Sequence, residues 1–389
     1  MKVLITTDWY KPAVNGVVTS VLSLADGLSK LGHEVRILTL SCSRHSYTEG
    51  NVTYIGSIGV GKIYPEARLK LASASPCIHD LLEWGPDIIH SQCEFSTFYV
   101  ARRIALLADC PLIHTYHTLY EDYTDYVLRP ARFGKFMATA FTRAVLKRTD
   151  EVIVPTMKIR RILARYGVHT PVEVIPTGLE LDRYREPLSG AERAARREAL
   201  GLAPSDRVLV YLGRLAKEKN IDELLRLLAA EEDDGLRLLL VGDGPYRQKL
   251  EELAGELCLG NRVIFCGMVR PEEVAGWYGL GDAFVSCSRS ETQGLTYIEA
   301  LAAGLPLLCQ EDPCLRGVVR PGVTGFTFDG PKAFHEQLRA LLSDEPGRKR
   351  MAAAARRAAF EEFSSLGFAR RVEEAYQRVL RRRRAARAA

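Results

Sequence analysis

Short apolar runs alternate with longer helical patterns along most of the chain. The runs that predict strands lie at residues 2–7, 34–40, 87–90, 112–116, 151–154, 207–212, 237–241, 262–265 and 283–286. Amphipathic stretches between them, such as Gly16 to Leu31 and Asp222 to Ala230, predict helices. Strands that alternate with helices form βαβ units, so the pattern predicts an α/β protein with parallel sheets covered on both faces.

The pattern starts again near the middle of the chain. The segment Val174 to Gly178 ends the first series of strands, and the helical stretch Ser189 to Leu202 precedes a fresh strand at Arg207. We therefore predict two Rossmann-like domains, residues 1–177 and 178–362, that face each other across a cleft. In such folds the carboxyl ends of the strands line the crevice where ligands bind.

The length of 389 residues agrees with two domains, because a single core stops growing at about 250–300 residues. Hydrophobic residues make up 47% and charged residues 26%, as in globular proteins. No apolar run approaches the roughly 18–20 residues of a membrane span, and the first run is too short for a signal peptide. The nine cysteines form no CxxC pair, which argues against a zinc site or disulfides and fits a cytoplasmic location.

The excess positive charge is concentrated in two places. Residues 129–165 hold ten Lys or Arg against two acids, and residues 378–389 hold six Arg and no acid, without which the net charge of +5 becomes −1. Arg129 to Arg148 predicts an amphipathic helix that either binds an anionic membrane surface or packs on the core with a solvated basic side. The run Arg381 to Arg384 either serves the same surface or is a disordered tail. No nucleic-acid-binding module accompanies the charge.

Two loops that follow predicted strands have residues suited to phosphate. Asn15-Gly16 opens the first helix, where free N–H groups and the helix dipole favour an anion, although it is equally suited to a simple helix cap. Arg214 and Lys219 follow the strand at 207–212, and two cations at that spacing would clamp a diphosphate. The alternative for these two is an ordinary solvated loop.

The segment from Ser288 to Ala300 is the most informative one. Glu291 follows a buried strand, Gly294 opens a helix, and Glu299 lies on the second turn of that helix. Free N–H groups at Leu295 and Thr296 would add an anion site, and two carboxylates beside it would bind a ligand rich in hydroxyl groups. The alternative is two solvated glutamates.

Together and in this order, these motifs resemble the nucleotide-sugar-dependent glycosyltransferases of family 4, which are retaining enzymes with the GT-B fold. The resemblance rests on the first glycine loop, the Gly213-Arg214…Lys219 clamp, Val241-Gly-Asp-Gly-Pro245 and the E-x7-E spacing of Glu291 and Glu299. The segments around Trp9, His90 and His114 are similar to those of bacterial diacylglycerol α-glycosyltransferases. The resemblance also implies that residues 363–389 form a helix, about Leu366 to Leu380, and a basic tail that return to the first domain.

The resemblance implies a role for each matching residue. Arg214 and Lys219 would hold the donor diphosphate, with backbone groups of Gly16, Leu295 and Thr296. Glu299 would bind the ribose, Glu291 the donor sugar, and the main chain near Met268 the uracil. His117 would contact the sugar near the reacting carbon, unless it is a polar core histidine. Asn15-Gly16 departs from the Gly-Gly that is common in the wider family, so this loop would approach the phosphates less closely.

The expected activity is transfer of glucose from UDP-glucose to the 3-hydroxyl of 1,2-diacylglycerol, at the inner face of the cell membrane. Cations and helix N-termini would stabilise the leaving UDP, so no metal or other cofactor is expected. The alternatives are another sugar such as galactose or mannose, another acceptor such as a glycolipid, phosphatidylinositol or a soluble glycan, and a UDP-sugar epimerase. An NAD dehydrogenase is disfavoured because Arg247 stands where a third glycine is needed, and a non-catalytic membrane scaffold leaves the two glutamates unexplained.

Overall fold

The computed structural model describes residues 1–13, 15–59, 68–70, 76–119 and 131–388, without the side chains of residues 131–133. Contacts divide the chain into two units. Unit 1 is residues 1–179 with 365–389, and unit 2 is residues 180–364. Each boundary falls two residues after the one expected from the sequence, and the final helix belongs to unit 1.

The described residues of unit 1 form an eight-stranded sheet in the order β10-β9-β8-β7-β1-β2-β4-β3, in which only β3 runs antiparallel to its neighbour. Its strands are β1 (Lys2–Thr6), β2 (Glu34–Leu40), β3 (Tyr47–Glu49), β4 (Val52–Ile55), β7 (Ile88–Ser91), β8 (Leu112–Thr115), β9 (Glu151–Val154) and β10 (Val172–Val174). A separate antiparallel pair joins β5 (Ser57–Gly59) to β6 (Arg68–Lys70). The sequence placed β1, β2, β7, β8 and β9 to within one or two residues, but it did not predict β3, β4 or β10.

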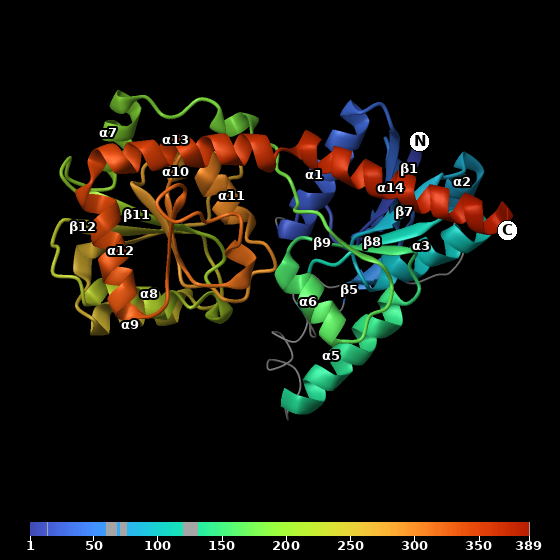
Figure 1. The fold of residues 1–389 in the computed structure, drawn as a ribbon, viewed down its shortest axis with the longest axis horizontal. Coiled ribbons are helices and arrows are strands. Elements are labelled where there is room, and N and C mark those ends of the chain that lie inside the picture. Colours follow the sequence, from blue (N-terminus) through green and yellow to red (C-terminus); the bar gives the residue numbers. More distant parts are fainter. Residues whose placement is uncertain (14, 60–67, 71–75, 120–130, 389) are drawn as a thin grey trace. The chain divides into compact units, whose positions relative to one another are not determined.

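Helices cover both faces of this sheet (Figure 1). One face packs on α1 (Gly16–Lys30) and α14 (Ser365–Ala388). The other packs on α2 (Pro76–Trp84), α3 (Ser96–Leu107), α5 (Ala131–Leu146) and α6 (Met157–Arg165). Successive strand residues point to opposite faces, so Leu4 joins one core cluster while Val3 and Ile5 join the other. A strand buried on both sides reads as a continuous apolar run, which explains the pattern in the sequence.

The helix α14 is longer than the sequence predicted, because it continues past Leu380 to Ala388. It packs closely on α1 at Gly27, where an added Cβ would lie 2.6 Å from the Cβ of Ala369. A glycine at this position is therefore required by the close approach of the two helices. The arginines after Leu380 lie within this helix, and Arg382, Arg383 and Arg387 pair with acids of unit 1, so the alternative of a disordered tail was wrong.

The described part of unit 2 has a six-stranded parallel sheet in the order β13-β12-β11-β14-β15-β16. Its strands are β11 (Arg207–Leu212), β12 (Leu236–Val241), β13 (Val263–Gly267), β14 (Ala283–Ser286), β15 (Leu307–Gln310) and β16 (Gly325–Phe328). Its helices are α7 (Gly190–Ala199), α8 (Ile221–Ala229), α9 (Arg247–Glu256), α10 (Val274–Tyr278), α11 (Leu295–Ala302), α12 (Pro331–Ser343) and α13 (Glu345–Glu362). Numbered within the unit, the order is 3-2-1-4-5-6, the Rossmann order, whose topological switch point lies between β11 and β14.

An aspartate before a strand fixes the start of the neighbouring strand at three places. Asp87, Asp150 and Asp282 precede β7, β9 and β14, and each accepts a backbone N–H bond of 2.7 or 2.8 Å from the adjacent strand. Asp282 also pairs with Arg193 and Arg197 of α7. These bonds satisfy backbone donors at the starts of strands, and each ties its strand to the neighbour, as the Asp282 bond ties β14 to β11.

Candidate active site

Two loops meet at the carboxyl edge of the unit 2 sheet, on either side of its switch point. One follows β11 and the other follows β14, and a parallel sheet binds ligands at this place. Three side-chain contacts join the loops: Lys219 with Glu291, Asn220 Nδ2 with the Cys287 carbonyl, and Ser290 Oγ with the Glu218 carbonyl. The topology therefore brings together the two segments that the sequence singled out.

Lys219 and Glu291 form an ion pair. Nζ of Lys219 donates to Oε1 of Glu291 at 2.6 Å, and both side chains are about one-fifth exposed. Ser288 Oγ donates to the same oxygen at 2.9 Å. The sequence predicted a diphosphate contact for the lysine and a sugar contact for the glutamate, but it did not predict that the two would bind each other. A nucleotide-sugar substrate that binds both side chains must break this ion pair, with its phosphate contacting Lys219 and its hydroxyl groups contacting Glu291.

The loop that carries Arg214 needs the glycines of the next loop. An added Cβ at Gly242 would lie 2.1 Å from the Gly213 carbonyl oxygen, and one at Gly244 would lie 2.3 Å from that of Leu215. Backbone bonds join the same loops, since Leu215 N donates to the Asp243 carbonyl. The Val241-Gly-Asp-Gly-Pro245 motif thus gives the Arg214 loop room to pack, with the Arg214 side chain exposed.

Glu299 lies in a partly buried site on α11. Its Oε2 accepts a hydrogen bond of 3.1 Å from the Tyr278 hydroxyl. Burial raises the pKa of Glu299 to about 7, and the bond from Tyr278 opposes that rise. Gly294 precedes the helix with φ of 76°, where a Cβ would lie 2.4 Å from the Tyr297 ring. The turn therefore requires glycine, and it leaves Leu295 and Thr296 in the first turn, where backbone N–H groups lack helical partners.

Two further predicted donor contacts are less defined. Asn15 caps α1, since its Oδ1 accepts from Val18 N at 3.0 Å, and Gly16 is the first helical residue. The capping alternative is therefore what the structure shows, and a phosphate contact by Gly16 stays a prediction. Met268 directly follows β13 and is 78% exposed, so its main chain stands at the carboxyl edge, and its contact with a base also stays a prediction.

Unit 1 gathers polar groups at the carboxyl ends of β1, β7 and β8. His117 Nε2 contacts Gln92 Oε1 at 2.7 Å, and His114 Nε2 contacts Glu94 Oε1 at 3.2 Å. Burial lowers the pKa of His117 to about 4, with Glu94 opposing that shift and His114 adding to it. In the same region burial raises the pKa of Asp8 to about 6. His117 is thus partly buried at the edge of the sheet with a polar partner, and its contact with a sugar stays a prediction.

The basic segment Arg129 to Arg148 is described only in part. Residues 129 and 130 lie outside the described residues, while α5 begins at Ala131. The apolar residues of α5 differ in exposure. Val145 is buried, whereas Phe136 and Met137 are 67% and 46% exposed beside Lys135 and other exposed basic residues. The helix therefore presents aromatic and basic side chains outward in the described unit, in addition to packing on the core.

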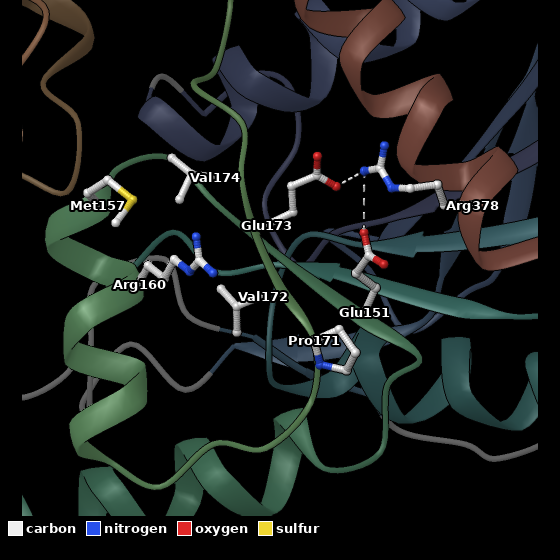
Figure 2. Close-up of a pocket in the computed structure, with 8 residues that line it drawn as sticks. All are labelled: Glu151, Met157, Arg160, Pro171, Val172, Glu173, Val174 and Arg378. Atoms are coloured by element: carbon white, nitrogen blue, oxygen red, sulfur yellow. Dashed lines mark ion pairs between the residues drawn. The ribbon is translucent and has the colours of Figure 1, made fainter. Parts of the chain in front are cut away.

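The arginines of α14 are largely paired with acids. Arg382 pairs with Glu151, Arg383 pairs with Asp109 at 2.9 Å, and Arg387 also contacts Asp109. Figure 2 shows Arg378 directed at the carboxylates of Glu173 and Glu151, in a shallow pocket beside the edge strand β10. Burial raises the pKa of Glu151, and the two arginines near it oppose that rise. This pocket contains none of the residues predicted for the donor.

Several residues of the site were not predicted to act there. Tyr278 and Ser288 hold the two glutamates, and Gln92 and Glu94 hold the histidines of unit 1. Gln92 lies two residues after His90, in one of the segments that carry the family resemblance, so its position after a strand was the available signal. Within the described ranges, no helix has the length and apolar character needed to cross a membrane, and no group of three or more metal-ligating side chains is found.

Solved structures share this fold over nearly the whole chain. Alr3699/HepE from Anabaena in complex with UDP matches with a TM-score of 0.74 and 17% identity, covering 97% of this chain and 100% of that one. Sucrose-phosphate synthase from Thermosynechococcus elongatus matches with 0.74 and 21%, covering 97% and 98%. These likenesses define the fold as GT-B, the two-domain fold of one class of glycosyltransferases.

The sequence comparisons identify the family. The family model "Glycosyltransferase Family 4" matches residues 14–183, and "Glycosyl transferases group 1" matches residues 192–358. The "Alpha-monoglucosyldiacylglycerol synthase" of Streptococcus pneumoniae is 34% identical over 97% of this chain and 85% of its own length. The protein of the same name from Acholeplasma laidlawii is 30% identical over 85% of each. The chain belongs to glycosyltransferase family 4 and is a hexosyltransferase.

The raised pKa of Glu299 predicts that unit 2 loses stability as pH rises. The pKa of Glu299 is about 7 in the folded state and 4.5 in its usual, unfolded state. The stability that this difference contributes is fully present below pH 4.5 and is lost as the pH rises through about 7. We expect the free energy of unfolding in urea to fall by up to about 3 kcal/mol between pH 5 and pH 8 through this group. Glu299→Gln should flatten that part of the profile. An unchanged slope in the variant would contradict the assignment.

Proposed function

We propose that this protein transfers glucose from UDP-glucose to the 3-hydroxyl of 1,2-diacylglycerol, with retention of configuration, on the inner face of the cell membrane. The proposed binding of UDP-glucose is supported by the Lys219–Glu291 ion pair at the switch point and by Glu299 on the adjoining helix. The acceptor half is supported by the printed name of the relatives from Streptococcus pneumoniae and Acholeplasma laidlawii.

The donor would displace the ion pair when it binds. Its diphosphate would attract Lys219 and the guanidinium of Arg214, while the first turn of α11 would offer N–H groups at Leu295 and Thr296. The released Glu291 carboxylate would then accept from sugar hydroxyls, and Glu299 would accept from the ribose. The phosphate would pair with the Lys219 ammonium and the sugar hydroxyls would donate to the Glu291 carboxylate. Breaking the ion pair therefore need not leave a buried charge without a partner.

Bond breaking would then depend on electrostatics. Cleavage of the anomeric C–O bond develops positive charge on the sugar and negative charge on the leaving UDP. Arg214, Lys219 and the N-terminus of α11 would stabilise the negative part, so we propose no metal and no other cofactor in this step. The departing phosphate would take the acceptor proton, so no side chain is assigned as a nucleophile.

The acceptor would come from a bilayer that contacts unit 1. Outward side chains of α5 include Phe136 and Met137, and those of α3 include Tyr99, Leu106 and Leu107, each at least 46% exposed. Phe95, just before α3, stacks on Phe141 of α5 with ring centroids 5.5 Å apart, so the two faces adjoin. Exposed apolar side chains beside lysines and arginines are suited to an anionic lipid surface.

The C-terminal arginines would contribute less to membrane contact than the sequence suggested. Arg382, Arg383 and Arg387 are already paired with acids of unit 1. Arg381 and Arg384 are exposed and would add attraction to an anionic surface. We therefore place the main lipid contact on α5 and α3.

A screen of donors and acceptors tests the proposed reaction. We expect mass spectrometry to detect a glucosyl diacylglycerol from UDP-glucose and diacylglycerol in vesicles, and NMR to identify the α-anomer. The other arms contain UDP-galactose, GDP-mannose, a glycolipid, phosphatidylinositol and inositol phosphate. Inositol phosphate is included because a relative named "D-inositol 3-phosphate glycosyltransferase" is 32% identical over 62% of this chain.

Substitutions in the proposed donor site test the same reaction. Arg214→Ala and Glu299→Ala should each lower turnover by about a hundredfold or more, whereas Arg226→Ala on the exposed face of α8 should not. A product only in another arm, or a new sugar formed without acceptor, would contradict the proposal.

The membrane contact makes a separate prediction. Replacing Phe136 and Met137 together by Ser should weaken sedimentation with anionic vesicles, because it removes the exposed apolar side chains of α5. Binding and activity should also fall with added salt, since each lysine or arginine near the surface contributes about 1 kcal/mol. Val323→Ser, an exposed apolar position of unit 2, is the matched control. Equal binding to neutral and anionic vesicles at all salt concentrations would overturn this part.

A further inference from the structure

The contact between His117 and Gln92 joins the chain just after β8 to the chain just after β7. Gln92 is 1% exposed, and its Oε1 lies 2.7 Å from Nε2 of His117. We propose that Gln92 is a positioning residue that holds His117 as the neutral ring with its proton on Nε2, so that Nδ1 accepts a hydrogen bond from a hydroxyl of the donor sugar. The sugar contact rests on the proposed function, whereas the state of the ring does not.

The assignment of the proton follows from the chemistry of the two groups. An amide oxygen only accepts hydrogen bonds, so the nitrogen that contacts it must donate. A neutral imidazole carries one proton, and placing it on Nε2 leaves a lone pair on Nδ1. A hydroxyl that meets Nδ1 must then be the donor, which selects one orientation of that hydroxyl group.

The groups around the ring keep it uncharged. Burial lowers the pKa of His117 to about 4; His114 adds to this shift and the Glu94 carboxylate opposes it. Glu94 is itself in contact with His114, and the buried His90 lies on the preceding strand β7. Among the residues that the structure describes, the partner of His117 Nε2 is the Gln92 amide and not a carboxylate, so this contact does not stabilise an imidazolium. A neutral ring avoids repulsion of the positive charge that develops on the sugar in the transition state.

Gln92 is anchored on one side and incompletely bonded on the other. Its backbone N donates to the Thr6 carbonyl at 2.8 Å, which fixes it against β1. Its buried Nε2 has no hydrogen-bond partner among the described residues. An unsatisfied buried amide destabilises a fold, so packing alone gives no reason for glutamine at this position. Orienting His117 does give one.

Nitrogen NMR of 15N-histidine-labelled full-length protein tests the assignment directly. In the wild type at pH 7 we expect the His117 ring to be neutral with Nε2 protonated. Gln92→Met has a similar length and cannot accept this bond, so the ring should become a mixture of tautomers. His90, held between Tyr376 and Thr115, serves as the internal control and should not change.

The matching kinetic readout separates positioning from folding. Gln92→Met should lower kcat about tenfold while KM for the donor changes less, because the ring contacts the sugar mainly as charge develops. Gln92→Glu should give an imidazolium at pH 7, with activity that recovers as pH is raised and the ring loses its proton. The second variant keeps the inference testable if the first one does not fold.

Two kinds of failure can be told apart. A wild-type ring with its proton on Nδ1, or an unchanged tautomer and kcat in Gln92→Met, would overturn the positioning role. If the wild-type protein transfers no sugar from any donor, the proposed function fails, while the NMR spectra still decide the state of His117.

Discussion

The contact between Lys219 and Glu291 joins two loops that are separated by 72 residues in the sequence. It forms because the strand order of unit 2 sends the chain outward in opposite directions after β11 and β14, which leaves a gap at their carboxyl ends. The bonds Asn220–Cys287 and Ser290–Glu218 hold the same loops together. Glycines at 242, 244 and 294 are required by the close packing around this contact. The proposed donor site depends on this pair, because we propose that Lys219 and Glu291 exchange partners when a nucleotide sugar binds.

Unit 1 uses the same topology for a different purpose. Its switch point lies between β1 and β7, and the loops there carry Asp8, Gln92 and Glu94, with His117 following the next strand. In this region His117 contacts Gln92 and His114 contacts Glu94, and burial lowers the pKa of His117. Nearby, α3 and α5 expose apolar and basic side chains. These features support our proposal that unit 2 binds the nucleotide sugar and that unit 1 meets an acceptor with an apolar part.

The sequence predicted the strands best where both faces are buried. Residues 34–40, 151–154, 207–212 and 283–286 were placed without error, because a strand covered on both sides is mostly apolar. It predicted α14 as ending near Leu380 because the arginines beyond resemble a solvated tail. In the structure Arg382 and Arg383 pair with acids on distant segments, which the sequence pattern does not reveal. The Lys219–Glu291 and Gln92–His117 contacts were missed for the same reason. Each depends on which strands are neighbours, which periodicity does not give.

A crystal structure of the full chain with UDP-glucose tests the central claim most directly. Without ligand, Nζ of Lys219 lies 2.6 Å from Oε1 of Glu291. With the donor bound, the account predicts that Nζ moves to a diphosphate oxygen and that the Glu291 carboxylate accepts from a hydroxyl of the glucose. The account would be contradicted by a structure in which UDP-glucose is bound and the ion pair remains intact, or in which the nucleotide lies away from the switch point between β11 and β14.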